Sequence, residues 1–336
     1  MVSGTNVATI EESRFILEQL TRLDTAGDLA QDVRYGLSLP QKKLSPKYFY
    51  DERGSLLYDK ICQVPEYYPA RTETALLKDR AEAIIEHVRP ITILELGSGT
   101  SSKTEHLLDA CELTRCHPRY LPLDVCEEML VDAGNRLLEQ YQWLNIRALL
   151  GDYSACFNQV PDSEGTRLYV FLGGTLGNLD ELEAQYFLSQ LSGMMSKTDY
   201  LLLGVDRVKD RDVLHAAYND SQGYTAEFNR NILNVINREL GADFNPERFS
   251  HRAWFNEGQS QIEMHLRSNT AQTVRIDELD MTVNFRQGET IHTEISRKFT
   301  LEALSALTSA AGLSVVQHFE PDNGYFSLAL LRRRAG

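Results

Sequence analysis

Short apolar segments alternate with helical segments between residues 91 and 206, and this alternation most limits what the chain can fold into. The apolar segments have the length and composition of buried strands. They cover residues 91–97, 120–125, 145–153, 167–174 and 199–206. The helical segments between them begin at Lys103 and cover residues 127–141 and 180–195. Strands that alternate with helices form βαβ units, so the sequence predicts a mostly parallel sheet with helices on both faces.

The alternation ends after residue 206, where an insert begins. Residues 209–243 look mostly helical, and residues 249–296 have the pattern of antiparallel strands. A helix over 300–312 and strands over 313–319 and 325–332 then complete the sheet. A two-stranded antiparallel finish distinguishes the methyltransferase sheet from the plain dinucleotide-binding fold. We therefore predict an α/β, Rossmann-like class I methyltransferase fold: a doubly wound sheet, mostly parallel with an antiparallel last strand, and an inserted α+β substrate-binding domain.

These patterns divide the chain into three parts. Residues 1–24 form a polar N-terminal extension with a helix over residues 11–23. Two segments, 25–71 and 209–298, are expected to form the substrate-binding domain. The cofactor-binding methyltransferase domain takes the remaining residues, 72–208 and 299–336.

The composition argues against several classes of partner. The chain has 336 residues, a net charge of −14 and a pI of about 5.1, and an acidic surface repels nucleic acids and anionic lipids. No apolar run approaches the ~18–20 residues that span a bilayer, and the first residues lack the regions of a signal peptide. Five cysteines without CxxC spacing indicate neither a metal site nor disulfides. We expect a cytoplasmic, monomeric protein with reduced thiols that binds neither nucleic acid nor membranes.

The predicted cofactor site begins with a glycine-containing loop. The segment ELGSGT, which contains Gly97, lies where the first strand meets a helix, and glycine lets the backbone approach a ligand closely. The segment lacks the third glycine of the GxGxxG motif that binds a pyrophosphate, which argues against a nicotinamide-dependent oxidoreductase. S-adenosylmethionine carries no phosphate and does not need that glycine.

Polar residues at the ends of the next two strands extend this site. Asp124 ends the second strand and can accept hydrogen bonds from ribose hydroxyls. Asp152 and Tyr153 follow the third strand, where the carboxylate can accept the adenine amine and the ring can stack on the base. Lys103, one turn into the first helix, can reach the methionine carboxylate. Each residue alone also fits an exposed loop or helix, but residues in register at successive strand ends favour a cofactor site.

Asn178 is the candidate that the fourth strand contributes to a substrate site. It lies in FLGGTLGNL, where an apolar strand gives way to a glycine-rich loop. An asparagine amide both donates and accepts hydrogen bonds, so it can bind the carboxylate and the amine of one amino acid. A left-handed turn or a helix N-cap would equally explain an asparagine here.

Several long segments resemble one family of enzymes. They are KYFYDERGSLLYDKI, PEYYPARTE, ELGSGTSSKT, VFLGGTLGNL, GVDRVKD, AYND, FNRNIL, IEMHLRS and TEISRKF. From about residue 30 to the C-terminus the chain is similar to the histidine Nα-methyltransferases of ergothioneine biosynthesis. The resemblance implies that S-adenosylmethionine supplies three methyl groups to the α-nitrogen of L-histidine, giving the betaine hercynine.

The resemblance also implies a set of site residues. The cofactor positions would be Gly97, Lys103, Asp124, Asp152 and Tyr153. The substrate positions would be Tyr67, Gly173, Asn178, Tyr218, Met264, Glu294 and Ser296, and the catalytic positions Tyr67, Asn178 and Tyr50. Tyr50, Gly173 and Met264 would line the pocket.

Within the substrate set, the resemblance assigns a separate task to each group. Asn178 and Tyr218 would hold the substrate carboxylate, and Tyr67 would lie by the amine. Glu294 and Ser296 would hold the imidazole.

The chemistry of these residue types suits methyl transfer to an amine. Tyrosine hydroxyls can hydrogen-bond an amine without adding charge, and tyrosine rings tolerate a growing quaternary ammonium. A carboxylate such as Glu294 suits an imidazole N–H. Glu294 and Ser296 share one strand face by the period of two, which also fits an exposed polar face, and Met264 also fits an ordinary core position.

Two other functions are alternatives to histidine methylation. A homologue that methylates tryptophan or a tryptophan derivative should lack the Glu294–Ser296 pair, which this chain has. A non-catalytic binding protein on the same scaffold is disfavoured by the intact cofactor loop.

Overall fold

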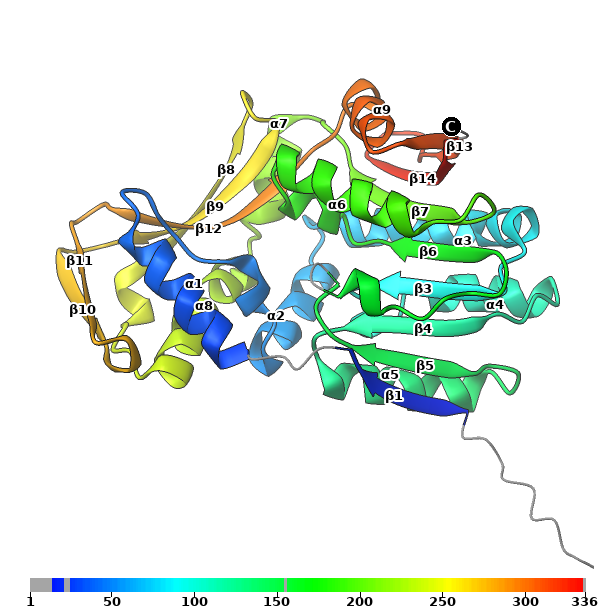
Figure 1. Ribbon diagram of the computed structural model, residues 1–336. Helices are drawn as coiled ribbons and strands as arrows, with labels where there is room; N and C mark the ends of the chain where they lie inside the picture. Colours follow the sequence, from blue (N-terminus) through cyan, green and yellow to red (C-terminus); the bar gives the residue numbers. More distant parts are fainter. Residues whose placement is uncertain (1–13, 21–24, 154–155, 335–336) are drawn as a thin grey trace, which may run out of the picture.

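The computed structural model describes residues 14–20, 25–153 and 156–334, which form two lobes (Figure 1). An eight-stranded sheet forms the larger lobe, with strand order β1-β5-β4-β3-β6-β7-β14-β13. In that order the strands are β1 (Phe15–Gln19), β5 (Ile146–Leu150), β4 (Arg119–Asp124), β3 (Thr92–Leu96), β6 (Arg167–Phe171), β7 (Tyr200–Asp206), β14 (Phe326–Arg333) and β13 (Leu313–Phe319).

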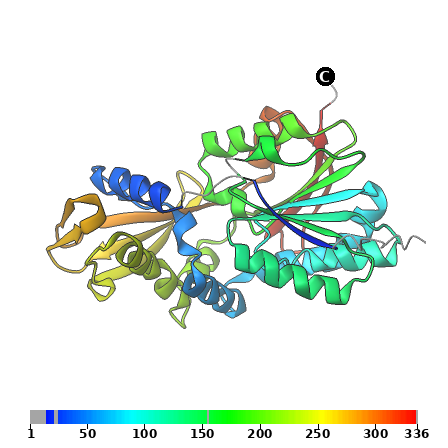
Figure 2. The same ribbon diagram turned by 60° about the horizontal axis from the view of Figure 1, so that its bottom comes forward.

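Helices cover both faces of this sheet, as the βαβ pattern predicts (Figures 1 and 2). One face packs against α3 (Tyr68–Val88), α4 (Glu105–Leu113) and α5 (Glu127–Gln140). The other face packs against α6 (Glu181–Met194) and α9 (Leu301–Ala310). Every residue of β3 is buried, because apolar side chains on both faces meet a layer of helices.

The last two strands distinguish this sheet from a plain dinucleotide-binding sheet. The strands from β1 to β7 pair in parallel, whereas β14 lies antiparallel between β7 and β13. The predicted α/β class I methyltransferase fold is therefore confirmed.

The prediction of a helix over residues 11–23 is wrong for the part that the structure describes. Residues Phe15–Gln19 form β1, which pairs in parallel with β5 and so satisfies backbone groups that an edge strand would leave open. The Arg14 guanidinium donates to three carbonyl oxygens around the end of α5. The Phe15 ring lies so close to Gly134 that a Cβ there would be 2.2 Å from the ring. The pairing of this short segment with β5 has outweighed its weak helical pattern.

The smaller lobe contains a four-stranded sheet of order β2-β12-β9-β8 and a hairpin, β10-β11. Its strands are β2 (Lys42–Lys43), β8 (Phe249–Asn256), β9 (Gln261–Ser268), β10 (Gln272–Ile276), β11 (Met281–Phe285) and β12 (Thr290–Arg297). Its helices are α1 (Thr25–Ser38), α2 (Glu52–Gln63), α7 (Arg211–Tyr218) and α8 (Tyr224–Leu240). One apolar core joins buried residues from 29–68 with others from 214–291, two stretches far apart in the sequence. Among the described helices, none has the length and apolar character needed to cross a membrane.

A β-bulge in β12 decides which face of this sheet carries Glu294. Before the bulge His292 pairs with His265, and after it Glu294 pairs with Met264. Side chains alternate along a strand, so His292 and Glu294, two residues apart, would share a face in a regular strand; the bulge at Thr293 removes this alternation. The bulge instead turns Glu294 to the inner face, where Met264 is buried in the core.

A short loop after β6 ties the two lobes together. The loop forms a 3-10 turn, η3 (Thr175–Asn178), that packs against β12. The Asn178 side chain donates from Nδ2 to the carbonyl oxygen of Ile295 at 2.8 Å. Gly177 lies so near β12 that a Cβ would be 2.8 Å from the carbonyl oxygen of Arg297. The contact between the lobes therefore depends on the missing side chain of Gly177.

We expect Gly177→Ala to lower the free energy of unfolding by about 1–3 kcal/mol, because the new methyl group must push η3 away from β12. Gly193→Ala is the control, since Gly193 lies in α6 where an added Cβ meets no atom of the described chain within 4 Å. Urea unfolding of both variants measures the difference. Equal stabilities for the two alanine variants would contradict the proposed contact.

Candidate functional site

The turn after β3 forms an open backbone loop at the carboxyl end of the sheet. Gly97 and Gly99 have φ angles of +70° and +50°, in the left-handed region that glycine adopts without strain. The N–H of Gly97 donates to the carbonyl oxygen of Leu123 at 2.8 Å, which holds the turn against β4. A Cβ on Gly97 would lie 3.4 Å from the Tyr153 ring. The turn thus leaves its backbone accessible next to an aromatic side chain.

Asp124 lies at the end of β4, where it holds this turn in place. Its Oδ2 accepts from the N–H of Gly99 at 2.8 Å, and its Oδ1 accepts from the N–H of Cys126 at 3.1 Å. Burial raises the pKa of the Asp124 carboxyl, although these two hydrogen bonds oppose the shift. Each carboxylate oxygen keeps a lone pair that can accept a ligand hydroxyl.

Asp152 and Tyr153 follow β5 and lie beside Asp124. The N–H of Gly151 donates to the carbonyl oxygen of Asp124 at 2.9 Å, which joins the two strand ends. The Tyr153 ring meets Phe171 edge-on, with ring centroids 5.6 Å apart, so its orientation is fixed. These positions suit stacking on a flat base and fit the adenine end of S-adenosylmethionine.

Glu73 is a residue of this site that the sequence analysis missed. It lies on α3 with 1% of its surface exposed, and its carboxylate accepts from Lys103 Nζ at 2.5 Å and from the Gly173 N–H at 2.9 Å. A Cβ on Gly204 would clash with the Glu73 carboxylate at 2.0 Å. Burial lowers the pKa of Lys103, but the charge of Glu73 outweighs burial and the pKa is raised. The sequence holds one signal, because Glu73 shares the apolar helix face of Leu76 and Leu77.

Four tyrosines and one phenylalanine form a cluster of rings, here called the aromatic wall. Tyr67 lies edge-on to both Tyr58 and Tyr218, with ring centroids 6.3 and 6.1 Å apart. Tyr50 lies at the outer edge, 46% exposed, against Tyr58 and Phe228. Burial raises the pKa of both Tyr58 and Tyr67 well above the ordinary value, so these phenols stay neutral. The sequence analysis did not select Tyr58 or Phe228.

Glu294 is a partly buried carboxylate on the inner face of β12. None of the described residues donates a hydrogen bond to its side chain, and its cross-strand neighbour Met264 is 1% exposed. Burial raises the pKa of Glu294 to about 7, while the charge of Lys298 opposes the shift. An acceptor with free lone pairs therefore lies near Met264 and within reach of the charge of Lys298.

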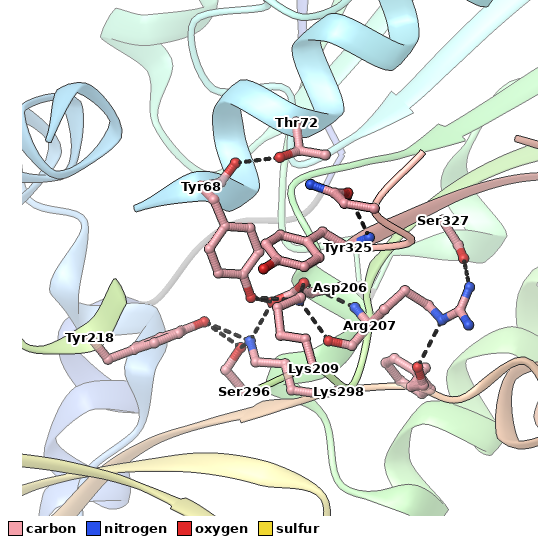
Figure 3. Close-up of polar contacts among 12 residues, drawn as sticks. Tyr68, Thr72, Asp206, Arg207, Lys209, Tyr218, Ser296, Lys298, Tyr325 and Ser327 are labelled. Atoms are coloured by element: carbon pink, nitrogen blue, oxygen red, sulfur yellow. Dashed lines mark hydrogen bonds and ion pairs between the residues drawn. The ribbon is translucent and has the colours of Figure 1, made fainter. Parts of the chain in front are cut away.

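A buried charged network borders the aromatic wall at Tyr218 (Figure 3). The Tyr218 hydroxyl lies 2.8 Å from Ser296 Oγ, and Lys298 Nζ lies 2.8 Å from both hydroxyl oxygens. Lys298 also pairs with Asp206 at 2.9 Å, and Lys209 binds the other carboxylate oxygen of Asp206. Burial by itself raises the pKa of Asp206, but the charges of the two lysines lower it below its ordinary value. Neither lysine was selected from the sequence.

The residues predicted to bind the cofactor adjoin the small lobe and its aromatic wall. Burial raises the pKa of the Cys62 thiol on α2, and the nearby charge of Lys103 opposes the shift. A Cβ on Gly173 would lie 3.6 Å from Lys103 Nζ, and the loop that contains Gly173 continues to Asn178 and β12. The site residues predicted on the two lobes are therefore brought to one boundary.

One group of potential metal ligands lies on the outer face of the small sheet, opposite Glu294. Donor atoms of Glu263, His265 and His292 lie within 4.8 Å of one another. The two imidazole rings are stacked, however, with centroids 4.6 Å apart and planes 23° apart. A nitrogen lone pair lies in the plane of its ring, so one ion cannot bind both rings in this arrangement. We assign no metal to this group.

Comparisons with known proteins agree with this geometry. The family model described as "Histidine-specific methyltransferase, SAM-dependent" matches residues 29–333. Histidine N-alpha-methyltransferases of Mycobacterium tuberculosis and Mycolicibacterium smegmatis are each 44% identical to this chain. The matches cover 91% and 92% of this chain, and 96% and 97% of the respective relatives. Ergothioneine biosynthesis protein 1 of Schizosaccharomyces pombe is 28% identical over 70% of this chain and 32% of its own length.

The shifted pKa of Glu294 predicts a measurable pH dependence of stability. Between its ordinary pKa of 4.5 and its folded pKa of about 7, the folded protein binds more protons than the unfolded chain. Stability is therefore lost as pH rises through this window. At each pH, the free energy of unfolding of the parent is subtracted from that of Glu294→Gln. This difference should be larger at pH 8 than at pH 5 by about 1–3 kcal/mol, because only the parent loses stability as pH rises.

Glu263→Gln is the matched control on the opposite face. Burial acts to raise the pKa of Glu263, but hydrogen bonds from Asn256 and Gln261 lower it overall. Its carboxylate therefore stabilises the fold at pH values above the ordinary pKa of 4.5, so the control should lose nearly the same stability at pH 5 as at pH 8. Urea unfolding at both pH values measures these differences. If Glu294→Gln changes the free energy of unfolding equally at both pH values, the folded protein does not favour the protonated form of the Glu294 carboxyl.

Proposed function

The chain belongs to the histidine-specific, S-adenosylmethionine-dependent methyltransferases, and on this premise we propose that it transfers three methyl groups to the α-amino nitrogen of L-histidine. The product would be hercynine, Nα,Nα,Nα-trimethylhistidine, an intermediate of ergothioneine biosynthesis. One observation supports histidine most strongly: Glu294 offers an unpaired carboxylate inside an aromatic pocket that adjoins the cofactor residues. A carboxylate in such a place binds an imidazole N–H by a charge-assisted hydrogen bond.

The alternative substrate is tryptophan or a tryptophan derivative. An indole has one N–H and a larger ring, and it has no second ring nitrogen for Ser296. A substrate that left Glu294 or the Tyr218–Ser296 pair without a partner would bind at a cost of about 1–3 kcal/mol per group, and more for the charged group. The pair of polar groups therefore favours histidine.

The residues around the glycine turn suit the proposed cofactor. Gly97 leaves the backbone open, Asp124 keeps two lone pairs for ribose hydroxyls, and Asp152 with Tyr153 lies where the adenine would be. Lys103 offers an ammonium group to the methionine carboxylate, and Glu73 holds that ammonium in place. S-adenosylmethionine supplies an activated methyl group on a sulfonium, so the protein needs no nucleophile of its own.

The protein must hold the amine neutral and in line with the methyl group. Asn178 and Tyr218 would hold the substrate carboxylate, which fixes the adjacent amine beside Tyr67 and Tyr50. Such positioning can contribute roughly 7–11 kcal/mol to the lowering of the barrier. The phenol of Tyr67 stays neutral because burial raises its pKa, so it can accept the amine N–H without adding charge. The aromatic wall also tolerates the positive charge that grows with each methylation.

The proposal also assigns the two ligands to separate parts of the chain. Residues 25–71 and 209–298 would bind the amino acid, and residues 72–208 and 299–336 would bind S-adenosylmethionine. The enzyme would act as a cytoplasmic monomer on a free small molecule, without a metal ion.

Incubation with S-adenosylmethionine and each of the twenty amino acids should give a trimethylated product from histidine alone. Mass spectrometry of the product measures the number of methyl groups, and fragmentation locates them. Methyl groups on the imidazole ring would contradict the proposal, as would faster methylation of tryptophan than of histidine.

We expect Glu294→Ala to reduce the specificity constant for histidine and to relax the exclusion of tryptophan. The ratio of specificity constants for the two substrates should fall by about 10- to 1,000-fold, because the variant no longer leaves a charged acceptor unpaired. Glu263→Ala, on the opposite face of the same sheet, is the control and should leave the ratio unchanged. An unchanged ratio in Glu294→Ala would mean that Glu294 does not discriminate between the side chains of histidine and tryptophan.

A further inference from the structure

Lys298 is a buried ammonium whose donors are all in use. Only 1% of its side chain is exposed, and Nζ has three acceptors: Asp206 Oδ2 at 2.9 Å, Tyr218 Oη at 2.8 Å and Ser296 Oγ at 2.8 Å. An ammonium group has three N–H donors and no acceptor. Both hydroxyl oxygens must therefore accept a hydrogen from Lys298 (Figure 3).

The hydrogens of the two hydroxyl groups can then be counted. The Tyr218 hydroxyl and Ser296 Oγ lie 2.8 Å apart, and this hydrogen bond uses one of their two hydrogens. Tyr218 is the donor in this bond, so the hydrogen of Ser296 is spare, and Lys298 cannot accept it because an ammonium only donates. No contact of the described chain joins this hydrogen to Asp206 while Lys298 occupies the carboxylate. If a substrate carboxylate takes the Tyr218 hydrogen, the Ser296 hydrogen remains free for a ring nitrogen that enters the pocket. Seen from the pocket, the Tyr218–Ser296 pair is a hydrogen-bond donor.

We propose that Lys298 is a positioning residue that makes the Tyr218–Ser296 pair a donor and thereby selects a neutral imidazole. This inference rests on the proposed function, because it takes histidine as the substrate. Glu294 lies two residues from Ser296 on the same face of β12 and accepts hydrogen bonds. A donor beside an acceptor matches the neutral imidazole, which has one N–H and one unprotonated nitrogen. Indole and pyrrole lack the second nitrogen. Imidazolium carries an N–H on both nitrogens, so one of these donors would face the O–H donor of the hydroxyl pair.

Lys209 shows that holding Asp206 and orienting the hydroxyls are separate tasks. Lys209 is 3% exposed and binds the other oxygen of Asp206, the Tyr68 hydroxyl at 2.6 Å and the carbonyl oxygen of Arg207 at 2.6 Å. It makes no hydrogen bond to Tyr218 or Ser296 among the contacts of the described chain. A substitution of Lys209 therefore disturbs the same buried carboxylate without touching the hydroxyl pair.

The test compares histidine with pyrrol-2-ylalanine and pyrrol-3-ylalanine. Each analogue keeps one ring N–H and replaces the other ring nitrogen by C–H, so it can satisfy Glu294 but gives no acceptor to the hydroxyl pair. Specificity constants for Nα-methylation are measured for the parent protein, Lys298→Met and Lys209→Met. The specificity constant for histidine is divided by that for the better analogue. This ratio measures how strongly the enzyme discriminates in favour of the unprotonated nitrogen. Effects on the carboxylate, the amine or the cofactor cancel in this ratio.

In the parent protein, histidine should exceed the better analogue by about 10- to 100-fold, because the analogue leaves a buried donor unpaired. In Lys298→Met, each hydroxyl oxygen regains a free lone pair and the spare hydrogen can turn to Asp206. The ratio should therefore shrink by about tenfold, mainly through the Michaelis constant. In Lys209→Met the ratio should stay at the parent value. An unchanged ratio in a folded, active Lys298→Met would overturn the inference, as would equal shrinkage in both lysine variants.

Lys298→Gln provides a second test if Lys298→Met does not fold. The glutamine amide still donates hydrogen bonds, but its oxygen can accept the spare hydrogen of the hydroxyl pair. The ratio should again shrink, and an unchanged ratio would overturn the inference. A different result would sink the proposed function instead: a parent protein that methylates histidine no better than other amino acids.

Discussion

The carboxylate of Asp206 holds both ends of the inserted lobe against the central sheet. The chain leaves the sheet after Asp206, at the end of β7, and returns at Phe299, whose N–H donates to the Asp206 carbonyl oxygen at 2.9 Å. The Asp206 side chain binds Lys209 at the start of the insert and Lys298 at its end. All three charges are buried, and removing charges from water is costly, so the loss of one partner would leave another uncompensated. The position of the two ends of the insert therefore depends strongly on this group.

This position brings the pocket to the edge of the sheet where a cofactor loop forms. Parallel strands end at the same edge, so the glycine turn after β3 and Asp124 after β4 lie together there. The loop after β6 reaches the insert at the same edge, through the hydrogen bond from Asn178 to Ile295. The residues proposed to bind the cofactor lie in the larger lobe, whereas those proposed to bind the substrate come from both lobes and meet at one boundary. Neither lobe contains the whole site.

The pocket retains a feature that reduces stability. Glu294 lies without a hydrogen-bond donor in a region where burial raises the pKa of its carboxyl to about 7. An unpaired group of this kind is expected where a ligand completes the set of partners. The same reasoning explains why neutral phenols, and not charged groups, line the remainder of the wall.

The sequence by itself determined the sheet, its antiparallel finish and the cofactor loop, because these depend on local patterns: apolar runs, helical spacing and glycine at a turn. It also indicated the family through long ordered motifs. Three features were decided only by the tertiary structure. Residues Phe15–Gln19 became a strand because β5 offered an edge, and Thr293 became a bulge that turned Glu294 inward. Lys298 reads in sequence as one more lysine, and only burial against Asp206 and two hydroxyls distinguishes it from a solvated one. Local patterns report the backbone, whereas the environment of a charge depends on segments distant in the chain.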